Sequence, residues 1–91
     1  QLVSSFGTNG AATLGQLAEA AGAGAIDDVK RYAHTLKSNA ASFGAGDLAE
    51  LCAALESEAR SGAVEDLDGK IADIADAFDG ARRALAELGG R

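Results

Sequence analysis

One side chain of this sequence is suited to nucleophilic chemistry and has no evident packing role. His34 is the only histidine among the 91 residues. The apolar residues around it recur with helical spacing and form one stripe, which consists of Ile26, Val29, Ala33, Leu36, Ala40 and Phe43. At about 100° per residue, the ring of His34 projects roughly 140° away from that stripe. We therefore expect an exposed imidazole that can act as a nucleophile toward a partner atom.

The residues that share the helical face of His34 are either cationic or small. They are Lys30, Arg31, Lys37, Ser38, Ala41 and Ala45. Ser38 and Ala41, one and two turns further along, are too small to cover the ring. Residues 30–46 contain three basic residues and no Asp or Glu, whereas the whole chain has a net charge of −6. This pattern predicts a local cationic patch that attracts an anionic group or an acidic protein face. The alternative is that these charges only solvate an exposed helix.

Composition and charge argue against several other functions. A net charge of −6 opposes nucleic acid as the main partner, because a phosphate backbone requires a basic face. Cys52 is the only cysteine, so the chain can form neither an internal disulfide nor a zinc site with His34. Its spacing from neighbouring leucines predicts a buried position. A nucleotide-dependent kinase or a hydrolase is disfavoured, because the sequence lacks a glycine-rich phosphate loop and a serine or cysteine paired with the histidine.

The sequence contains no stretch close to the roughly 20 apolar residues that span a bilayer, and no signal peptide. We therefore expect a cytoplasmic protein and no membrane contact by this segment. Because the chain begins at Gln1 rather than at methionine, we expect it to be processed or cut from a longer protein.

Glycines divide the chain into segments with helical periodicity, without the alternation typical of strands. The helix that carries His34 is expected to begin after Gly24 and to stop at Gly44, with Gly46 completing the turn. Short connections make neighbouring helices antiparallel.

A capping-box pattern predicts the start of the next helix. Asp47 is followed three residues later by Glu50, so a helix should run from about Asp47 to near Arg60, before Gly62. The last segment predicts a helix of about 36 Å. Its seam repeats in steps of three and four and consists of Val64, Leu67, Ile71, Ile74, Phe78, Ala81, Leu85 and Leu88. Gly69 and Gly80 lie off this seam and have no evident role.

The N-terminal segment leaves two alternatives open. One helical face can be formed by Leu2, Val3, Phe6, Leu14, Leu17 and Ala21, although Gly7, Gly10 and Gly15 weaken a helix. Alternatively, Thr8 or Asn9 caps a second helix after a short extra N-terminal helix. Either way, the sequence predicts an all-α protein, a single domain over residues 1–91 that folds as an antiparallel up-and-down four-helix bundle.

The segment 33–45 resembles the histidine-containing phosphotransfer (HPt) domain family of two-component phosphorelays. That family has a histidine followed by leucine after two residues, lysine after three, and Gly-Ala after ten and eleven. The matching residues here are His34, Leu36, Lys37, Gly44 and Ala45. A leucine-rich, cysteine-containing helix that ends in Leu-Glu commonly follows, as in Leu48, Leu51, Cys52, Leu55 and Glu56. Many members have glycine after the lysine, where this chain has Ser38.

The resemblance implies a phosphocarrier rather than an enzyme. His34 would accept a phosphoryl group from the aspartyl phosphate of a response-regulator receiver domain and pass it to the aspartate of another receiver. Lys37 would neutralise the phosphoryl charge. Ser38 would leave the imidazole accessible, and its hydroxyl could donate a hydrogen bond to a phosphoryl oxygen. The residues that would contact the partner are Lys30, Arg31, Ala41 and Ala45. No cofactor is expected on this chain, because the Mg²⁺ and its acidic pocket would belong to the receiver.

Several points stay open at the level of sequence. Asp27, seven residues before His34, lies on roughly the correct face to hold the second ring nitrogen. The parent protein could be a stand-alone carrier or a hybrid histidine kinase, including a membrane-anchored one. We expect a monomer. The competing interpretation is a non-catalytic helical interaction or dimerisation module that uses the seam of residues 64–88 as a coiled-coil face.

Overall fold

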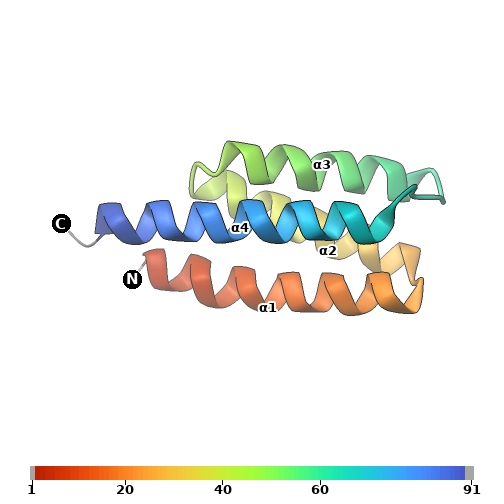
Figure 1. Cartoon of the computed structure of the whole chain (residues 1–91), viewed down its shortest axis with the longest axis horizontal. Coiled ribbons are helices and arrows are strands. Elements are labelled where there is room, and N and C mark those ends of the chain that lie inside the picture. Colours follow the sequence, from red (N-terminus) through yellow and green to blue (C-terminus); the bar gives the residue numbers. More distant parts are fainter. Residues whose placement is uncertain (1, 90–91) are drawn as a thin grey trace.

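The computed structural model describes the backbone of residues 2–89 and the side chains of residues 9–87. This described part consists of four helices: α1 (Leu2–Ala23), α2 (Ile26–Ser42), α3 (Gly46–Arg60) and α4 (Leu67–Gly89). Each helix runs antiparallel to the one before it, in a bundle of 44 × 19 × 19 Å (Figure 1). Helices α1 and α3 each pack against both α2 and α4, so α2 and α4 lie diagonally opposite. The predicted antiparallel four-helix bundle is confirmed.

The turn after α2 explains why the His34 helix ends where it does. Gly44 adopts a left-handed φ of +75°, which glycine accepts without a steric penalty. Its N–H donates to the carbonyl of Ala41 at 3.2 Å, and the N–H of Ala45 donates to the carbonyl of Ala40 at 2.9 Å. These two bonds form a Schellman motif, so the predicted stop at Gly44 is confirmed. Gly46, expected to complete the turn, is instead the first residue of α3.

The predicted capping box of α3 is wrong. Ala45 occupies the N-cap position, and no side-chain hydrogen bond caps the helix there. Because the Schellman turn delivers the chain directly into α3, the helix begins before Asp47 can serve as its cap. Asp47 lies in the first turn instead, where its negative charge interacts favourably with the helix dipole. The end of the helix at Arg60 agrees with the prediction.

The N-terminal segment forms one continuous helix, so the alternative of a short extra helix with a cap at Thr8 or Asn9 is wrong. Gly10 shows why a glycine is accepted within this helix. A Cβ atom at Gly10 would lie only 2.5 Å from Cε1 of Phe78 on α4, whose side chain is buried. The glycine therefore lets the ring pack against the backbone of α1. The predicted apolar positions Leu2, Val3, Phe6 and Leu88 lie outside the described side chains.

Helix α4 begins at Leu67, three residues later than the start of the predicted seam. Asp66 precedes it with a φ of +50°, a conformation that Asp tolerates better than most residues. Its carboxylate accepts a hydrogen bond from the N–H of Gly69 at 3.3 Å and so caps the helix. A Cβ at Gly69 would collide with this carboxylate, which explains why a glycine occupies this position. Val64 lies before the helix but still packs against the core.

The core lies between the four helices. Its largest fully buried side chains are Leu17, Leu36, Leu48, Leu55, Ile74, Val29 and Cys52. Each buried aliphatic side chain contributes about 1.5–3 kcal/mol through removal of apolar surface from water. Cys52 is a core residue, as predicted, and burial raises the pKa of its thiol to about 12. None of the described helices is both long enough and apolar enough to cross a membrane.

Candidate functional site

His34 lies on the outer face of α2. The stripe opposite it is confirmed, because Val29, Ala33, Leu36 and Ala40 are all fully buried. Burial of this stripe fixes the rotation of α2 about its own axis and turns the opposite face toward solvent. The side chain of His34 is accordingly 58% exposed, as the helical periodicity predicts.

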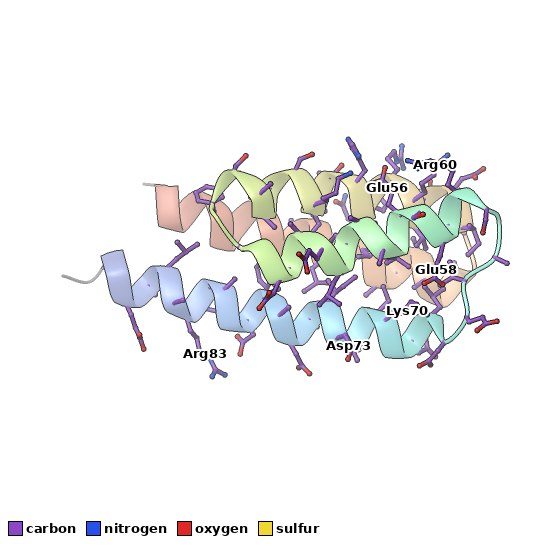
Figure 2. The ribbon with its side chains drawn as sticks, turned by 90° about the horizontal axis from the view of Figure 1, so that it is seen from above. Glu56, Glu58, Arg60, Lys70, Asp73 and Arg83 are labelled. Carbon is purple, nitrogen blue, oxygen red and sulfur yellow. The ribbon has the colours of Figure 1, made fainter. Side chains whose placement is uncertain are left out.

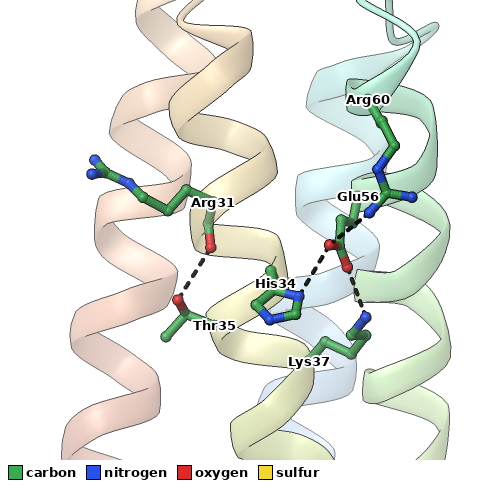
Figure 3. Close-up of polar contacts among 6 residues, drawn as sticks. All are labelled: Arg31, His34, Thr35, Lys37, Glu56 and Arg60. Atoms are coloured by element: carbon green, nitrogen blue, oxygen red, sulfur yellow. Dashed lines mark hydrogen bonds and ion pairs between the residues drawn. The ribbon is translucent and has the colours of Figure 1, made fainter.

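A buried carboxylate from α3 meets the imidazole. Glu56, whose side chain is only 9% exposed, places Oε2 at 3.0 Å from Nδ1 of His34. Lys37 donates from Nζ to Oε1 at 2.8 Å, and Arg60 donates from Nη2 to Oε2 at 3.1 Å (Figure 3). Both oxygens of one carboxylate are thus held by groups from α2 and α3. This arrangement restricts the rotation of Glu56 and fixes its position beside the ring.

The charge state of Glu56 follows from these partners. The hydrogen bond from Lys37 is the main effect that lowers the pKa of Glu56 below its ordinary value, and it outweighs the opposing effect of burial. The charges of Lys37 and His34 act in the same direction. The pKa of Glu56 is lower in the folded protein than in the unfolded chain. Its carboxylate therefore stabilises the fold fully at pH values above the unfolded-state pKa. This stabilisation is lost as the pH falls through the folded-state pKa. At neutral pH, Glu56 is therefore ionised.

The hydrogen bond to Glu56 distinguishes the two ring nitrogens of His34. An ionised carboxylate can only accept hydrogen bonds, so Nδ1 must carry the hydrogen of this contact. In the neutral ring, Nε2 then keeps its lone pair. Figure 3 shows Nε2 on the side of the ring that points away from Glu56. The geometry therefore presents a nucleophilic nitrogen to the outside of the bundle.

Glu56 corrects one expectation about this site. The suggestion that Asp27 holds the second ring nitrogen is wrong, since Glu56 on the neighbouring helix makes that contact. The helical periodicity of α2 could not reveal it, because the two residues are 22 positions apart in the sequence. One signal was nevertheless present: Glu56 follows Cys52 by one turn and adjoins Leu55 on the buried side of α3. An acidic residue on such a face requires a partner.

The expectation of an unbalanced cationic patch is also wrong. Lys37 is ion-paired with Glu56, and Arg31 is ion-paired with Asp28 at 3.1 Å. The guanidinium of Arg31 also lies 4.9 Å from the ring centroid of Tyr32, a residue that packs against the core. Asp28 lies outside residues 30–46, the segment that has no acidic residue, and Glu56 comes from another helix. The surface around His34 is therefore charged but nearly balanced.

A surface hollow of about 610 Å³ opens beside the ring, between α2 and α3. Its lining consists of Asp27, Asp28, Lys30, Arg31, His34, Thr35, Glu56 and Arg60. Arg60, which the helical periodicity of α2 cannot reveal, enters this lining from the C-terminal end of α3. Figure 2 shows Glu56 and Arg60 on the α2 side of α3, whereas Glu58 points toward Lys70 on α4. Glu56 and Arg60 therefore lie on a different side of α3 from Glu58.

The small residues predicted around His34 differ in their placement. Ser38 and Ala41 are exposed on α2, as expected, and leave the ring accessible. Ala45 lies beyond the end of α2, is half-buried, and packs against the core. It lines a second hollow, of about 460 Å³, between the α2–α3 turn and α4. The helical projection failed at Ala45 because the helix has already ended there.

The chain was compared with known protein families, curated proteins and solved structures. A family model described as the Hpt domain matches residues 1–87. No curated protein and no solved structure gives a match. The match to the family model confirms the resemblance detected in the sequence, and it covers all four helices almost completely.

Proposed function

The chain belongs to the Hpt domain family, whose members are phosphocarriers of two-component signalling, and we propose from this premise that His34 is its phosphoryl acceptor. His34 takes a phosphoryl group from the aspartyl phosphate of one receiver domain and passes it to the aspartate of another. The site needs no nucleotide of its own. The receiver supplies Mg²⁺ and the acidic pocket that binds it.

The observation that carries this proposal is the orientation of the imidazole. Its Nδ1 is engaged by the buried carboxylate of Glu56, and its side chain as a whole is 58% exposed. A nitrogen lone pair directed to solvent can reach the phosphorus atom of a docked partner. Phosphoryl transfer proceeds through a loose transition state, so alignment and charge neutralisation contribute more than covalent machinery. A fixed ring on a packed helix provides that alignment.

Two neighbours of His34 support the reaction in this proposal, and further residues form the surface that the receiver contacts. Lys37 lies one turn from His34, with its ammonium already held at Glu56, and it neutralises charge on the incoming phosphoryl group. Ser38, exposed one turn along, donates a hydrogen bond to a phosphoryl oxygen. The receiver contacts the surface around the ring, which includes Lys30, Arg31 and Ala41 and extends toward Ala45 at the turn.

The competing interpretation as a dimerisation module loses its main support in the bundle. Leu67, Ile71, Ile74, Phe78, Ala81 and Leu85 all lie in the protein's own core or pack against it. The seam of α4 is therefore used within the chain. We accordingly propose that the protein acts as a monomer.

A transfer assay tests the function directly. We expect the protein to acquire phosphoryl groups from one or more receiver domains that have been phosphorylated with acetyl phosphate. The product should be labile in acid and stable in base, and phosphorus NMR should show a phosphorus bonded to nitrogen, because the acceptor is an imidazole. Failure of every receiver in a broad panel to transfer its label would contradict the proposal.

Access to the ring can be tested at Ser38. We expect Ser38→Phe to slow transfer from a receiver about a hundredfold, because helical side chains lean toward the N-terminus and a small displacement of reacting atoms is costly. The rate of label transfer is the measurement, with circular dichroism to verify the fold. Ala72→Phe is the matched control, since Ala72 is exposed on α4, diagonally opposite α2. Equal rates for the two variants would show that receivers do not approach over Ser38.

A further inference from the structure

We propose that Arg31 selects the receiver domains with which this protein exchanges phosphoryl groups. Its fixed guanidinium donates hydrogen bonds to an acceptor oxygen on the docked receiver. The inference rests on the proposed function of His34 and adds a determinant of partner choice to it. Arg31 acts when the receiver docks against α2, and it does not touch the phosphoryl group.

The guanidinium of Arg31 is held by two neighbours on its own helix. Its Nη2 donates to Oδ1 of Asp28 at 3.1 Å and to the hydroxyl oxygen of Tyr32 at 3.3 Å. Its Cζ lies 4.9 Å from the centroid of the Tyr32 ring, within the range of a cation–π interaction. Tyr32 itself packs against the core. The support beneath Arg31 is therefore part of the packed bundle, which an ordinary ion pair along a helix lacks.

Although it is held in place, Arg31 is open to a partner. Its side chain is 64% exposed and lines the same hollow as His34. Figure 3 shows the guanidinium beside His34, on the side of the ring opposite Glu56. Nη2 uses its hydrogens for Asp28 and Tyr32, whereas those on Nε and Nη1 have no acceptor among the described residues. These remaining donors are available to a protein that covers the hollow.

A fixed arginine binds an acceptor at a lower entropic cost than a mobile one. Ordering a long side chain on binding lowers affinity, and contacts that already restrict it in the free protein reduce that loss. The guanidinium is also always charged and weakly hydrated, which suits it to protein interfaces. Lys30 lines the same hollow but makes no hydrogen bond or ion pair with any of the described residues. Arg31 is therefore the better anchor of the two.

A fixed donor discriminates between receivers because docking either satisfies it or leaves it unsatisfied. A receiver that places a carbonyl or carboxylate oxygen opposite Arg31 gains a hydrogen bond to a charged donor. A receiver with apolar atoms there removes water from the donors and replaces it with nothing. Asp28 adds a second condition, because its half-exposed carboxylate repels an acidic group placed directly against it. Selection therefore depends on a penalty as well as on an attraction.

Transfer kinetics with a panel of receivers phosphorylated by acetyl phosphate test the proposal. The rate of transfer is measured against receiver concentration, with the receiver in excess. Arg31→Met keeps a long side chain over Tyr32 and removes the donors. For the receivers that transfer best, it should raise the half-saturating concentration about tenfold and change the maximal rate less than about twofold. Receivers that transfer poorly should change little, so the preference among receivers narrows.

Two further variants separate the fixed guanidinium from charge alone. In the matched control Arg82→Met, the lost arginine also pairs with an aspartate three residues before it, Asp79, at 2.8 Å. Because Arg82 lies on α4, diagonally opposite α2, its concentration dependence should equal that of the unchanged protein. Arg31→Lys keeps the charge but loses the planar group that rests on Tyr32, so the half-saturating concentration should still rise several-fold. Equal affinity of Arg31→Lys and the unchanged protein would overturn the proposal.

The salt dependence identifies the acceptor on the receiver. If it is a carboxylate, the loss of affinity in Arg31→Met should shrink as salt rises from about 0.05 to about 0.5 M, because screening weakens the attraction in the unchanged protein. If it is a backbone carbonyl, the loss should stay nearly constant. Both results support a hydrogen bond from Arg31. Circular dichroism verifies that each variant is folded.

A measurement on the unchanged protein is independent of any folding defect. When the best receiver is added without phosphoryl groups, exchange of the Arg31 guanidinium hydrogens with water should slow in NMR spectra. Guanidinium signals that stay the same, while amide signals around His34 move, would overturn the proposal. The two levels of inference fail differently. If no receiver labels the protein, the proposed function fails. If receivers label it but Arg31→Met and Arg82→Met behave alike, the role of Arg31 fails and the function of His34 stands.

Discussion

His34→Gln is expected to abolish phosphoryl uptake from every phosphorylated receiver while leaving the bundle folded. A glutamine amide has no basic nitrogen lone pair, so it cannot form the N–P bond. The fold should persist because the side chain is 58% exposed and Glu56 keeps its bonds to Lys37 and Arg60. We expect the free energy of unfolding to change by less than about 1 kcal/mol. Acid-labile, base-stable labelling measures the uptake, and helical circular dichroism measures the fold.

The matched control for this variant is Glu58→Gln. It also places a glutamine on the bundle surface, but Glu58 points toward Lys70 on α4 rather than toward the α2 side (Figure 2). Its labelling should equal that of the unchanged protein. Label that persists in His34→Gln, with the same acid and base stability, would show that another residue carries the phosphoryl group.

Gly10→Ala is expected to lower the free energy of unfolding by about 1–3 kcal/mol, although alanine is the better helix former. The new Cβ would lie 2.5 Å from Cε1 and 3.1 Å from Cζ of Phe78. Because that ring is 95% buried, its side chain has little room to move away. Either the ring leaves its preferred position or α1 and α4 separate locally. Denaturant unfolding followed by circular dichroism gives the magnitude.

Gly15→Ala is the control on the same helix. Gly15 is exposed, and a Cβ there would have no neighbour within 4 Å. The substitution should therefore raise the free energy of unfolding by about 0.5–1 kcal/mol, through the difference in helix propensity alone. If both substitutions stabilised the protein to the same extent, the close approach of Phe78 to α1 would not exist in solution.

Much of the fold could be predicted from the chain because its signals are local. The apolar stripe with Val29 and Leu36 set the rotation of α2, and a glycine at Gly44 supplied the left-handed residue of its C-terminal turn. These features depend on helix geometry and on the conformational preference of single residues. The predicted capping box at Asp47 is wrong, and the cause is again a local signal. Two competing local signals overlapped, and the turn before the helix left Ala45, not Asp47, at the cap.

The sequence by itself determined that His34 is exposed on a helix of an antiparallel bundle, because a period of 3.6 residues separates a buried face from an exposed one. Only the tertiary structure decided which nitrogen of the ring faces outward. That choice depends on the register in which α2 and α3 pack, which places Glu56 opposite His34 across 22 residues of sequence. The same is true of Gly10, whose structural role depends on the ring of Phe78 on another helix. Contacts between helices arise from packing of whole surfaces, and no single segment encodes them.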